Sequence, residues 1–347
     1  MQWKQLGVVT FILTMLTSCQ VEGQVVNLYT DRHYEIDQLL FDAFQEETGI
    51  HVNVVKLDAD PLLTRLETEG SSTQADLIFL ADAGRLGRAK ARNLLKPFPD
   101  EAMFDMVPDY LKDDDLNWVG LTKRARMFVY HPDRFDPSVV PTYEDLANPD
   151  WSGRLAVRSS SHIYNQSLVA AMIERIGGEA TSIWLEGLVD HFAIRDPLTG
   201  STNPIGNDRD QAKAVYYGLA DVAIMNSYYF GRMANSEDQS EVQVAEALSV
   251  FFPNQNDGGT HINISGAGLT RYGKRQDNAL AFMAYLLTPS VQSMFANANF
   301  EYPIRTDVEP HPLLVSWGNF EEQAIPLSVL YTHSQEAYQR MVAAGWQ

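Results

Sequence analysis

The sequence predicts an α/β protein in which a mostly parallel sheet is covered by helices on both faces. Apolar strands expected at 25–29, 50–55 and 76–80 alternate with helical segments, and the connections between them are short. Two later apolar segments, 118–130 and 261–269, are candidates for strands that cross from one domain into another. A chain of 347 residues also has room for two domains of ordinary size.

The three helices expected in the N-terminal part have recognisable ends. The first carries apolar residues on one face from Ile36 to Phe44 and stops at Gly49. The second begins at Asp60 with a proline in its first position and runs to Gly70, and the third spans 85–92. This regular alternation is what predicts the parallel part of the sheet.

The rest of the chain is less regular. We expect a helix to start at 142–146, a strand to follow Trp151, and a polar loop at 159–167 to open another helix. The segment 196–208 predicts a loop because it contains two prolines and two glycines, and a buried strand at 221–225 follows it. Segments 250–253 and 261–269 are typical of two paired strands around a glycine-rich turn, and the C-terminal third is helical from about Asp277.

The N-terminus predicts export and a lipid anchor. A positively charged start precedes the apolar run 6–16, which is too short to span a bilayer. The run ends in LTSC at 16–19, which resembles a bacterial lipobox. We therefore expect a lipoprotein signal peptide at 1–18, lipidation of Cys19, and a tether at 19–24 that holds the protein to a membrane. A plain signal peptide that happens to contain a cysteine is the alternative; Cys19 is the only cysteine, so no internal disulfide can form.

Charge and motifs exclude several classes of function. The net charge of −19 at pH 7 argues against nucleic acid and anionic lipid headgroups as partners. The sequence contains no Gly-x-Ser-x-Gly elbow, no Walker-type phosphate loop, no His-Glu-x-x-His and no Cys-x-x-Cys. Carboxylates are plentiful, but no constellation singles out an acid/base pair. We therefore do not expect an enzyme.

Two adjacent tyrosines, Tyr228 and Tyr229, follow the strand expected at 221–225. Ligands of open α/β sheets bind at this carboxyl end of the strands, so both phenols can reach one site if the backbone turns there. Ordinary apolar packing is the alternative. A second pair, Tyr216 and Tyr217, ends a helical pattern before a glycine, and we expect that pair only to pack.

Two further tyrosines are expected at similar places. Tyr34 follows the first strand with His33 beside it, and Tyr164 lies in the polar loop at 159–167. A phenolate is a hard anionic oxygen ligand, and neutral imidazole is a common ligand of iron. Because the phenol pKa is about 10, only a strongly charged cation ionises it at neutral pH. Several phenolates would therefore select Fe³⁺ over divalent ions, whereas each tyrosine taken singly can equally be a packing or stacking residue.

Four sequence blocks resemble the ferric-iron-binding proteins of ABC importers, specifically the FutA type within the FbpA-like group. They are NLYTDRHY at 27–34, the serine-rich segment 159–170, NSYYFGR at 226–232, and the segment 251–263. The blocks follow the family's order, and the resemblance covers nearly the whole mature chain. Thr30 and Asp31 stand where relatives often have serines, and His162 adds an imidazole two residues before Tyr164.

This resemblance implies a two-lobed periplasmic-binding-protein fold of type II. Each lobe would be a mixed, mostly parallel sheet flanked by helices, with crossing strands as the hinge. The expected N-terminal lobe is 25–120 with 259–308, and the expected C-terminal lobe is 121–258 with 309–347. The resemblance also implies the Fe³⁺ ligands, which by motif are His33, Tyr34, Tyr164, Tyr228 and Tyr229.

Charge arithmetic adds a set of compensating cations. Four phenolates around Fe³⁺ leave a net charge of −1, which is costly in a buried site. Arg124 in the expected crossing strand and Arg232, three residues beyond Tyr229, are the cations best placed to compensate, with Arg126 next. Structural ion pairs at the lobe junction are the alternative for Arg124 and Arg126.

We therefore expect a monomeric, exported solute-binding protein, periplasmic and anchored at Cys19. Its cargo would be Fe³⁺, and its partners would be the permease and ATPase subunits of an ABC importer. The alternative within binding proteins is an organic solute such as a polyamine, thiamine or a sugar, with the tyrosines as stacking groups. A hydrolase or transferase on the same scaffold is a different class, which no arrangement of nucleophile and base supports.

Overall fold

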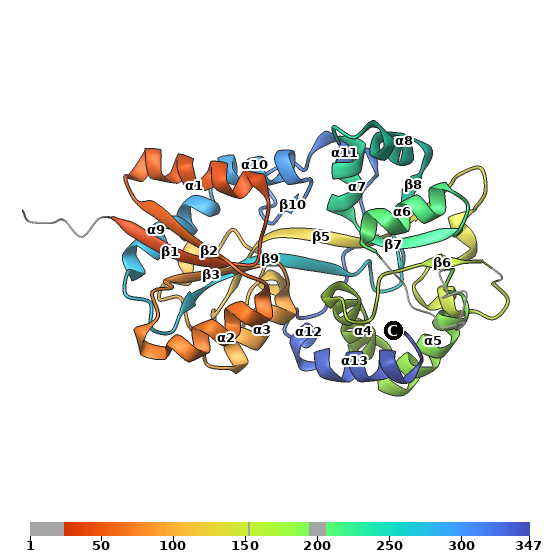
Figure 1. Cartoon of the computed structure of the whole chain (residues 1–347), viewed down its shortest axis with the longest axis horizontal. Coiled ribbons are helices and arrows are strands. Elements are labelled where there is room, and N and C mark those ends of the chain that lie inside the picture. The colour runs from red at the N-terminus through yellow and green to blue at the C-terminus, as the bar shows by residue number, and fades with distance from the viewer. Residues whose placement is uncertain (1–23, 152, 194–205) are drawn as a thin grey trace, which may run out of the picture.

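A computed structural model describes residues 24–151, 153–193 and 206–347. The predicted signal peptide, the lipidation site Cys19 and most of the loop predicted at 196–208 lie outside the described residues. The described chain consists of two halves joined by long strands that run through the middle of the molecule (Figure 1). This arrangement confirms the predicted two-lobed α/β architecture.

The N-terminal part alternates strand and helix as predicted. Gly49 ends the first helix in a left-handed conformation with φ of 73°, which a residue without a Cβ adopts without strain. The elements of this part are β1 (Val25–Thr30), α1 (Glu35–Thr48), β2 (His51–Lys56), α2 (Ala59–Glu69), β3 (Leu77–Leu80), α3 (Ala83–Ala91) and β4 (Leu95–Lys96).

The chain then enters the second half on its longest strand and later returns. The outgoing elements are β5 (Val119–Tyr130), β6 (Leu155–Ala156), α4 (Ile163–Ile176), α5 (Gly178–Asp190), α6 (Asp208–Tyr216), β7 (Val222–Asn226), α7 (Ser227–Ala234), α8 (Gln239–Ala247) and β8 (Ser249–Phe251). The elements that follow are β9 (Ile262–Thr270), α9 (Gln276–Leu286), α10 (Pro289–Asn299), β10 (Tyr302–Pro303), α11 (Pro312–Ser316), α12 (Val329–Thr332) and α13 (Ser334–Ala343). Short 3₁₀ helices lie at Gly70–Ser72, Ala102–Phe104, Asp109–Leu111, Pro137–Val139 and Glu144–Ala147.

The strands form one mixed sheet in the order β2-β1-β3-β9-β5-β7-β6. β1 pairs in parallel with β2 and β3, and β6 pairs in parallel with β7. Antiparallel pairs join β3 to β9, β9 to β5 and β5 to β7. The sheet is more mixed than predicted, because the strands that connect the halves run against their neighbours.

β5 is the strand that both halves share. Its first part, up to Ala125, pairs with β9, and its last part, from Arg126, pairs with β7. β8 and β9 were expected to pair with each other, and that prediction is wrong. Both pair with β5, β8 opposite Phe128–Tyr130 and β9 opposite Val119–Ala125, so the two strands follow one another along β5 and do not face each other.

Three local predictions also need correction. The helix expected from 142–146 is only a short 3₁₀ turn. Tyr228 and Tyr229 lie in the first turn of α7, not in a loop, because Asn226 is the last extended residue and the helix begins directly after it. Tyr217, expected to pack, lies just beyond the last residue of α6 and is 69% exposed.

Buried apolar strands fix the positions of the strand ends. Every residue of β3, β7 and β9 is buried, and so is most of β5. The polar turns that follow β1 and β7 are therefore held on a rigid sheet. Among the residues that the structure describes, no single helix is long and apolar enough to cross a membrane, and one bent pair, Gln276–Leu286 with Pro289–Asn299, passes that test by length and composition only.

Candidate metal centre

Four tyrosines lie at helix N-termini that meet between the two halves. Tyr34 is the residue that precedes α1, Tyr164 lies in the first turn of α4, and Tyr228 and Tyr229 lie in the first turn of α7. α1 belongs to one half and α4 and α7 to the other (Figure 1). Since the N-terminus of a helix carries partial positive charge, all three helix ends favour an anionic oxygen nearby.

Tyr228 contacts each of the other three tyrosines. The hydroxyls of Tyr164 and Tyr228 are 3.1 Å apart and share a hydrogen bond. The ring of Tyr34 meets that of Tyr228 edge-on with 5.9 Å between centroids, and Tyr229 stacks on Tyr228 at 4.3 Å. The contact between Tyr34 and Tyr228 joins the two halves. The structure thus brings together all four tyrosines that the sequence selected.

Tyr34, Tyr164 and Tyr228 are difficult to ionise while no cation is present. Burial, with the Glu301 carboxylate nearby, raises the pKa of Tyr34 to about 12. Burial and the other phenols raise the pKa values of Tyr164 and Tyr228 well above the ordinary value. These three phenols therefore stay protonated at neutral pH, and a cation must displace their protons to bind them.

Arg124 and Arg232 lie beside the cluster as predicted. The Arg124 guanidinium carbon is 5.4 Å from the centroid of the Tyr164 ring, and that of Arg232 is 5.7 Å from the Tyr34 ring. Arg124 donates to the Ala81 carbonyl at 2.6 Å, and its carboxylate partner, Asp82, is 3.9 Å away. Arg232 forms no ion pair with any residue that the structure describes. Both cations are therefore available to compensate negative charge on the phenols.

Arg126 takes part in a buried ion-pair network, as the alternative interpretation had it. It donates to Asp208 at 2.5 Å, and Arg158 donates to the other oxygen of the same carboxylate at 2.9 Å. Burial alone would raise the pKa of Asp208, but the two guanidinium groups hold it below its ordinary value. Arg126 also lies 5.9 Å and Arg158 5.6 Å from the Tyr164 ring.

The Asp208 carboxylate also links the two turns that carry three of the tyrosines. It accepts the backbone N–H of Asn226, the residue before α7, at 3.0 Å. Arg126, which it holds, donates to the side chain of Asn165, the residue after Tyr164, at 2.7 Å. One buried acid therefore ties the start of α4 to the start of α7.

Arg32 is a cation of the cluster that the sequence did not single out. Its guanidinium carbon lies between two rings, 4.5 Å from Tyr34 and 4.4 Å from Phe79. Asp37 at 3.0 Å and Glu301 at 3.3 Å bind the same group. Because two carboxylates offset one guanidinium, Arg32 fixes the orientation of the Tyr34 ring without adding net positive charge.

The two histidines of the predicted region have different settings. His33 is exposed. The His162 ring accepts the backbone N–H of Tyr164 at 3.3 Å and lies edge-on to the Tyr164 ring, with 4.3 Å between centroids. Burial and Arg158 lower the pKa of His162 to about 3. His162 therefore serves as a neutral cap of α4.

The donor set fits a hard trivalent cation. Within the described residues, no group of three or more histidine, cysteine, aspartate or glutamate side chains is arranged to hold a metal ion. The phenols supply hard oxygen donors that a divalent ion would ionise poorly, and the helix ends and arginines stabilise phenolates. The cluster is therefore suited to a small, highly charged, oxygen-seeking ion.

The architecture and the interlobe site define the class of protein. Residues 40–322 match the family model described as bacterial extracellular solute-binding protein, and the chain belongs to that family. Members of this class bind a solute for uptake and are not classed by a catalytic activity.

Three similar proteins are named for iron. The chain is 39% identical to iron uptake protein A1 of Synechocystis sp., over 94% of this chain and 88% of that protein. It is 38% identical, with a TM-score of 0.87, to a Trichodesmium FutA (IdiA) structure in complex with iron and citrate, over 93% of this chain and all of that one. It is 37% identical, with a TM-score of 0.86, to the ferric binding protein of Campylobacter jejuni, over 93% of this chain and all of that one. The resemblance inferred from the tyrosine motifs is confirmed.

The sequence analysis did not identify two residues that support the site, Arg32 and Asp208. Arg32 could have been suspected, because it lies between the first strand and Tyr34 inside the first matching block. Asp208 gave no signal, since it lies far from every tyrosine block and its partners come from three other elements.

Proposed function

We propose that this protein captures Fe³⁺ between its two lobes through Tyr34, Tyr164, Tyr228 and Tyr229 and delivers it to an ABC permease. The observation that carries this proposal is the contact of phenols from both lobes at one point. Iron-uptake names among relatives that align over most of both chains support it. We assign the N-terminal lobe to 25–120 with 259–308 and the C-terminal lobe to 121–258 with 309–347.

The chemistry of binding follows from the charges of the ion, the four phenols and the neighbouring arginines. Fe³⁺ displaces the protons of the four phenols, which leaves a net charge of −1 on the ion and its ligands. Arg124 and Arg232 offset that charge, and the three helix N-termini stabilise it further. His33 would complete the ligand set only by turning inward, because its ring is exposed beside Tyr34.

The division of ligands between lobes couples binding to shape. Tyr34 comes from one lobe and the other three tyrosines from the second, so the ion is fully bound only when the lobes are closed. A permease that recognises the closed shape would then accept only the loaded protein. Reduction to Fe²⁺ lowers the charge that keeps the phenols ionised, and it offers one route of release.

The N-terminal features place this function outside the cytoplasm. We infer that residues 1–18 direct export, that Cys19 is lipidated, and that residues 19–24 tether a monomer in the periplasm. Mass spectrometry of the native protein tests the anchor. An unmodified Cys19 would contradict it and would leave the metal site untouched.

Ferric titration followed by visible absorbance tests the proposed function. Iron on several phenolates gives a charge-transfer colour, so we expect a visible band that saturates at one ion per chain. Metal analysis of the purified protein should find iron. A colourless protein after ferric loading, or thermal stabilisation by a polyamine, thiamine or a sugar without any by iron, would contradict the proposal.

A further inference from the structure

The segment that joins α10 to β10, residues Asn299 to Tyr302, lies beside the tyrosine cluster where the two lobes meet, and we call it the α10–β10 corner. α10 comes from the half that contains Tyr34 and approaches α7, which comes from the other half (Figure 1). β10 pairs with β5 opposite Thr122 and Lys123. The corner is therefore fixed to the strand that both halves share.

Phe300 of the corner packs on α7, the helix that carries Tyr228 and Tyr229. Its side chain lies directly over Gly231: a Cβ at that position would be 2.5 Å from the Phe300 Cβ and 2.7 Å from its Cγ, so the two residues could not keep their places. Only glycine leaves room for the ring. Phe300 also shares a buried apolar cluster with Tyr228, and Tyr34 and Tyr229 pack against that cluster. Phe300 therefore contacts the second lobe directly behind the phenols.

The backbone of Phe300 has a conformation that phenylalanine rarely adopts. Its φ of 55° lies in the left-handed region, which strains a residue with a Cβ and which glycine adopts freely. Phe300 is the residue that ends α10, a position where glycine is the common choice. A phenylalanine is kept in such a conformation only where the surrounding structure holds it there. The contact with Gly231 and the apolar cluster supplies that support.

The next residue, Glu301, holds the one clustered tyrosine that comes from the N-terminal lobe. Its buried carboxylate accepts the Arg32 guanidinium at 3.3 Å, and that guanidinium packs on the Tyr34 ring at 4.5 Å. The same carboxylate accepts the Thr122 hydroxyl and the Asn299 amide, each at 2.8 Å. Burial alone would raise the pKa of Glu301, but Arg32 and the Asn299 amide hold it below its ordinary value. Glu301 is therefore a charged anchor for Arg32 at neutral pH.

Two adjacent residues of the corner thus support ligands from opposite lobes. Phe300 contacts the helix that carries two of the phenols, and Glu301 holds the cation that packs on the Tyr34 ring. We propose that the α10–β10 corner is a spacer that sets the distance between Tyr34 and the tyrosines of α7 in the closed protein, with Phe300 and Glu301 as positioning residues of the ferric site. This inference rests on the proposed function, because the spacer matters only if both lobes bind one ion.

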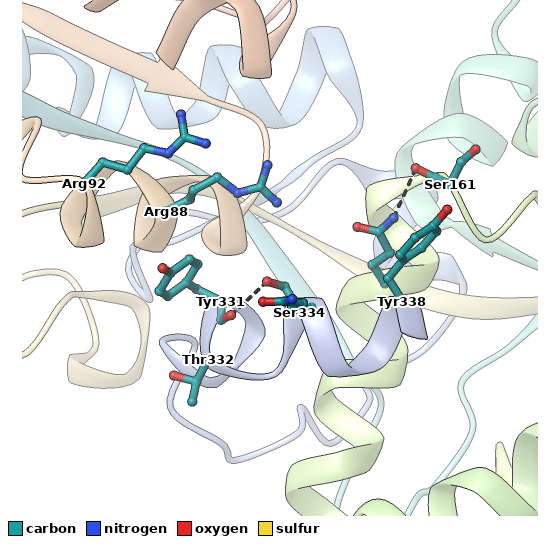
Figure 2. A pocket seen from close by; sticks show the side chains of 9 residues that line it. Arg88, Arg92, Ser161, Tyr331, Thr332, Ser334 and Tyr338 are labelled. Atoms are coloured by element: carbon teal, nitrogen blue, oxygen red, sulfur yellow. Dashed lines mark hydrogen bonds between the residues drawn. The ribbon is translucent and has the colours of Figure 1, made fainter. Parts of the chain in front are cut away.

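A second glycine contact between the lobes provides a matched control. Gly87 of α3 lies against Tyr331 of α12, and a Cβ at residue 87 would be 2.5 Å from the Tyr331 Cβ, the same distance as at the corner. Figure 2 shows Tyr331 beside α3, where it lines a cavity of about 760 Å³ that none of the four clustered tyrosines lines. Tyr331 therefore has space into which it can move, and its displacement does not press on a phenol.

The test compares wild type with Gly231→Ala, Phe300→Gly, the double variant that carries both changes, and the control Gly87→Ala. The added Cβ of Gly231→Ala displaces the Phe300 side chain, whereas Phe300→Gly removes the atoms that this Cβ would meet and also suits the left-handed backbone. Each protein is loaded with Fe³⁺. The visible band of the loaded protein and the rate at which a competing chelator removes the iron are then measured.

We expect Gly231→Ala to lose iron at least about tenfold faster than wild type, with a weaker and shifted visible band, because the phenols of the two lobes no longer reach the ion together. Phe300→Gly should lose iron several times faster than wild type. The double variant should be no faster than Phe300→Gly, since the clash is gone, and Gly87→Ala should match wild type. Equal acceleration by Gly231→Ala with and without Phe300, or the same acceleration in Gly87→Ala, would overturn the proposal.

The spacer and the proposed function fail in distinguishable ways. If wild type develops no ferric band, the proposed function is wrong and the spacer falls with it. If wild type develops the band and Gly231→Ala keeps both its band and its rate of iron loss, only the spacer is wrong. Should melting curves show that Gly231→Ala does not fold, Phe300→Gly and Glu301→Gln decide: faster iron loss with a shifted band in both supports the spacer, and wild-type behaviour in either overturns it.

Discussion

The chain contains the dipeptide Tyr-Tyr twice, and the two pairs have different surroundings. Tyr216 and Tyr217 lie at the C-terminal end of α6 with their rings edge-on at 5.0 Å, and Tyr217 is 69% exposed. Tyr228 and Tyr229 lie at the N-terminal end of α7 with stacked rings, and Tyr228 is 1% exposed. The same residues therefore occupy opposite poles of two helices.

The comparison shows which features suit a pair of phenols to bind a cation. The N-terminal pole of α7 favours an anion, whereas the C-terminal pole of α6 disfavours one. Tyr228 and Tyr229 also meet Tyr164 and Tyr34 from other elements, with Arg124 nearby. Residue type alone does not define the site; helix polarity, burial and neighbouring cations do.

Replacing both tyrosines of a pair by phenylalanine gives the largest expected difference between the two pairs. We expect Tyr228→Phe with Tyr229→Phe to abolish most of the ferric band and to weaken ferric affinity by at least about 10³-fold, about 4 kcal/mol, because two of four phenolates are lost. Tyr216→Phe with Tyr217→Phe is the matched control and should leave both unchanged. Visible absorbance in a competitive chelator titration measures the effect. An equal loss of ferric affinity in the two double variants would contradict the difference between the two pairs.

The Asp208 carboxylate, which holds the turn before Tyr228, gives the next largest expected effect. Asp208→Asn leaves Arg126 and Arg158 without their buried partner, so the free energy of unfolding should fall by about 3–5 kcal/mol. Asp221→Asn, which removes the charged partner of the half-exposed Arg154, should cost about 0–1 kcal/mol. Chemical denaturation measures both. A small loss in Asp208→Asn would mean that the turns are held by other contacts.

The cations near each pair should differ in importance. Arg124→Gln and Arg232→Gln each remove compensating charge and should weaken ferric affinity by about 10–100-fold, as loss of outer groups at metal sites does. Arg134 donates to the carbonyl of Tyr216, so Arg134→Gln is the matched control and should have no effect. Unchanged affinity in both site variants would contradict their role.

Proton release gives the smallest and most specific difference. Burial raises the pKa values of Tyr34, Tyr164 and Tyr228, that of Tyr34 to about 12. A phenol that binds the ion as phenolate releases its proton, so affinity rises with pH. On binding Fe³⁺, the Tyr229→Phe variant should release one proton fewer than wild type. Its affinity should therefore rise about tenfold less per pH unit than that of wild type. Tyr217→Phe should match wild type. Ferric titrations at several pH values measure these slopes, and identical slopes in all three proteins would contradict ligation by Tyr229.

The sequence predicted the clustering of the four tyrosines better than it predicted their surroundings. Tyr34 and Tyr228 follow apolar strands with clear limits, so their place at a sheet edge could be inferred from local pattern. The turn that aims Tyr229 could not, because it depends on α7 starting directly after Asn226. Asp208 escaped notice because long-range contacts leave no trace in local spacing. The extent of antiparallel pairing was underestimated for the same reason, since the partners of β9 lie far from it in the chain.

A crystal structure of the iron-loaded protein, with anomalous data collected at the iron absorption edge, tests the central claim most directly. The account predicts one strong anomalous peak between the lobes, within bonding distance of the phenol oxygens of Tyr34, Tyr164, Tyr228 and Tyr229. A peak bonded to residues of one lobe only, or an iron-loaded protein in which Tyr34 stays away from the metal, would contradict it.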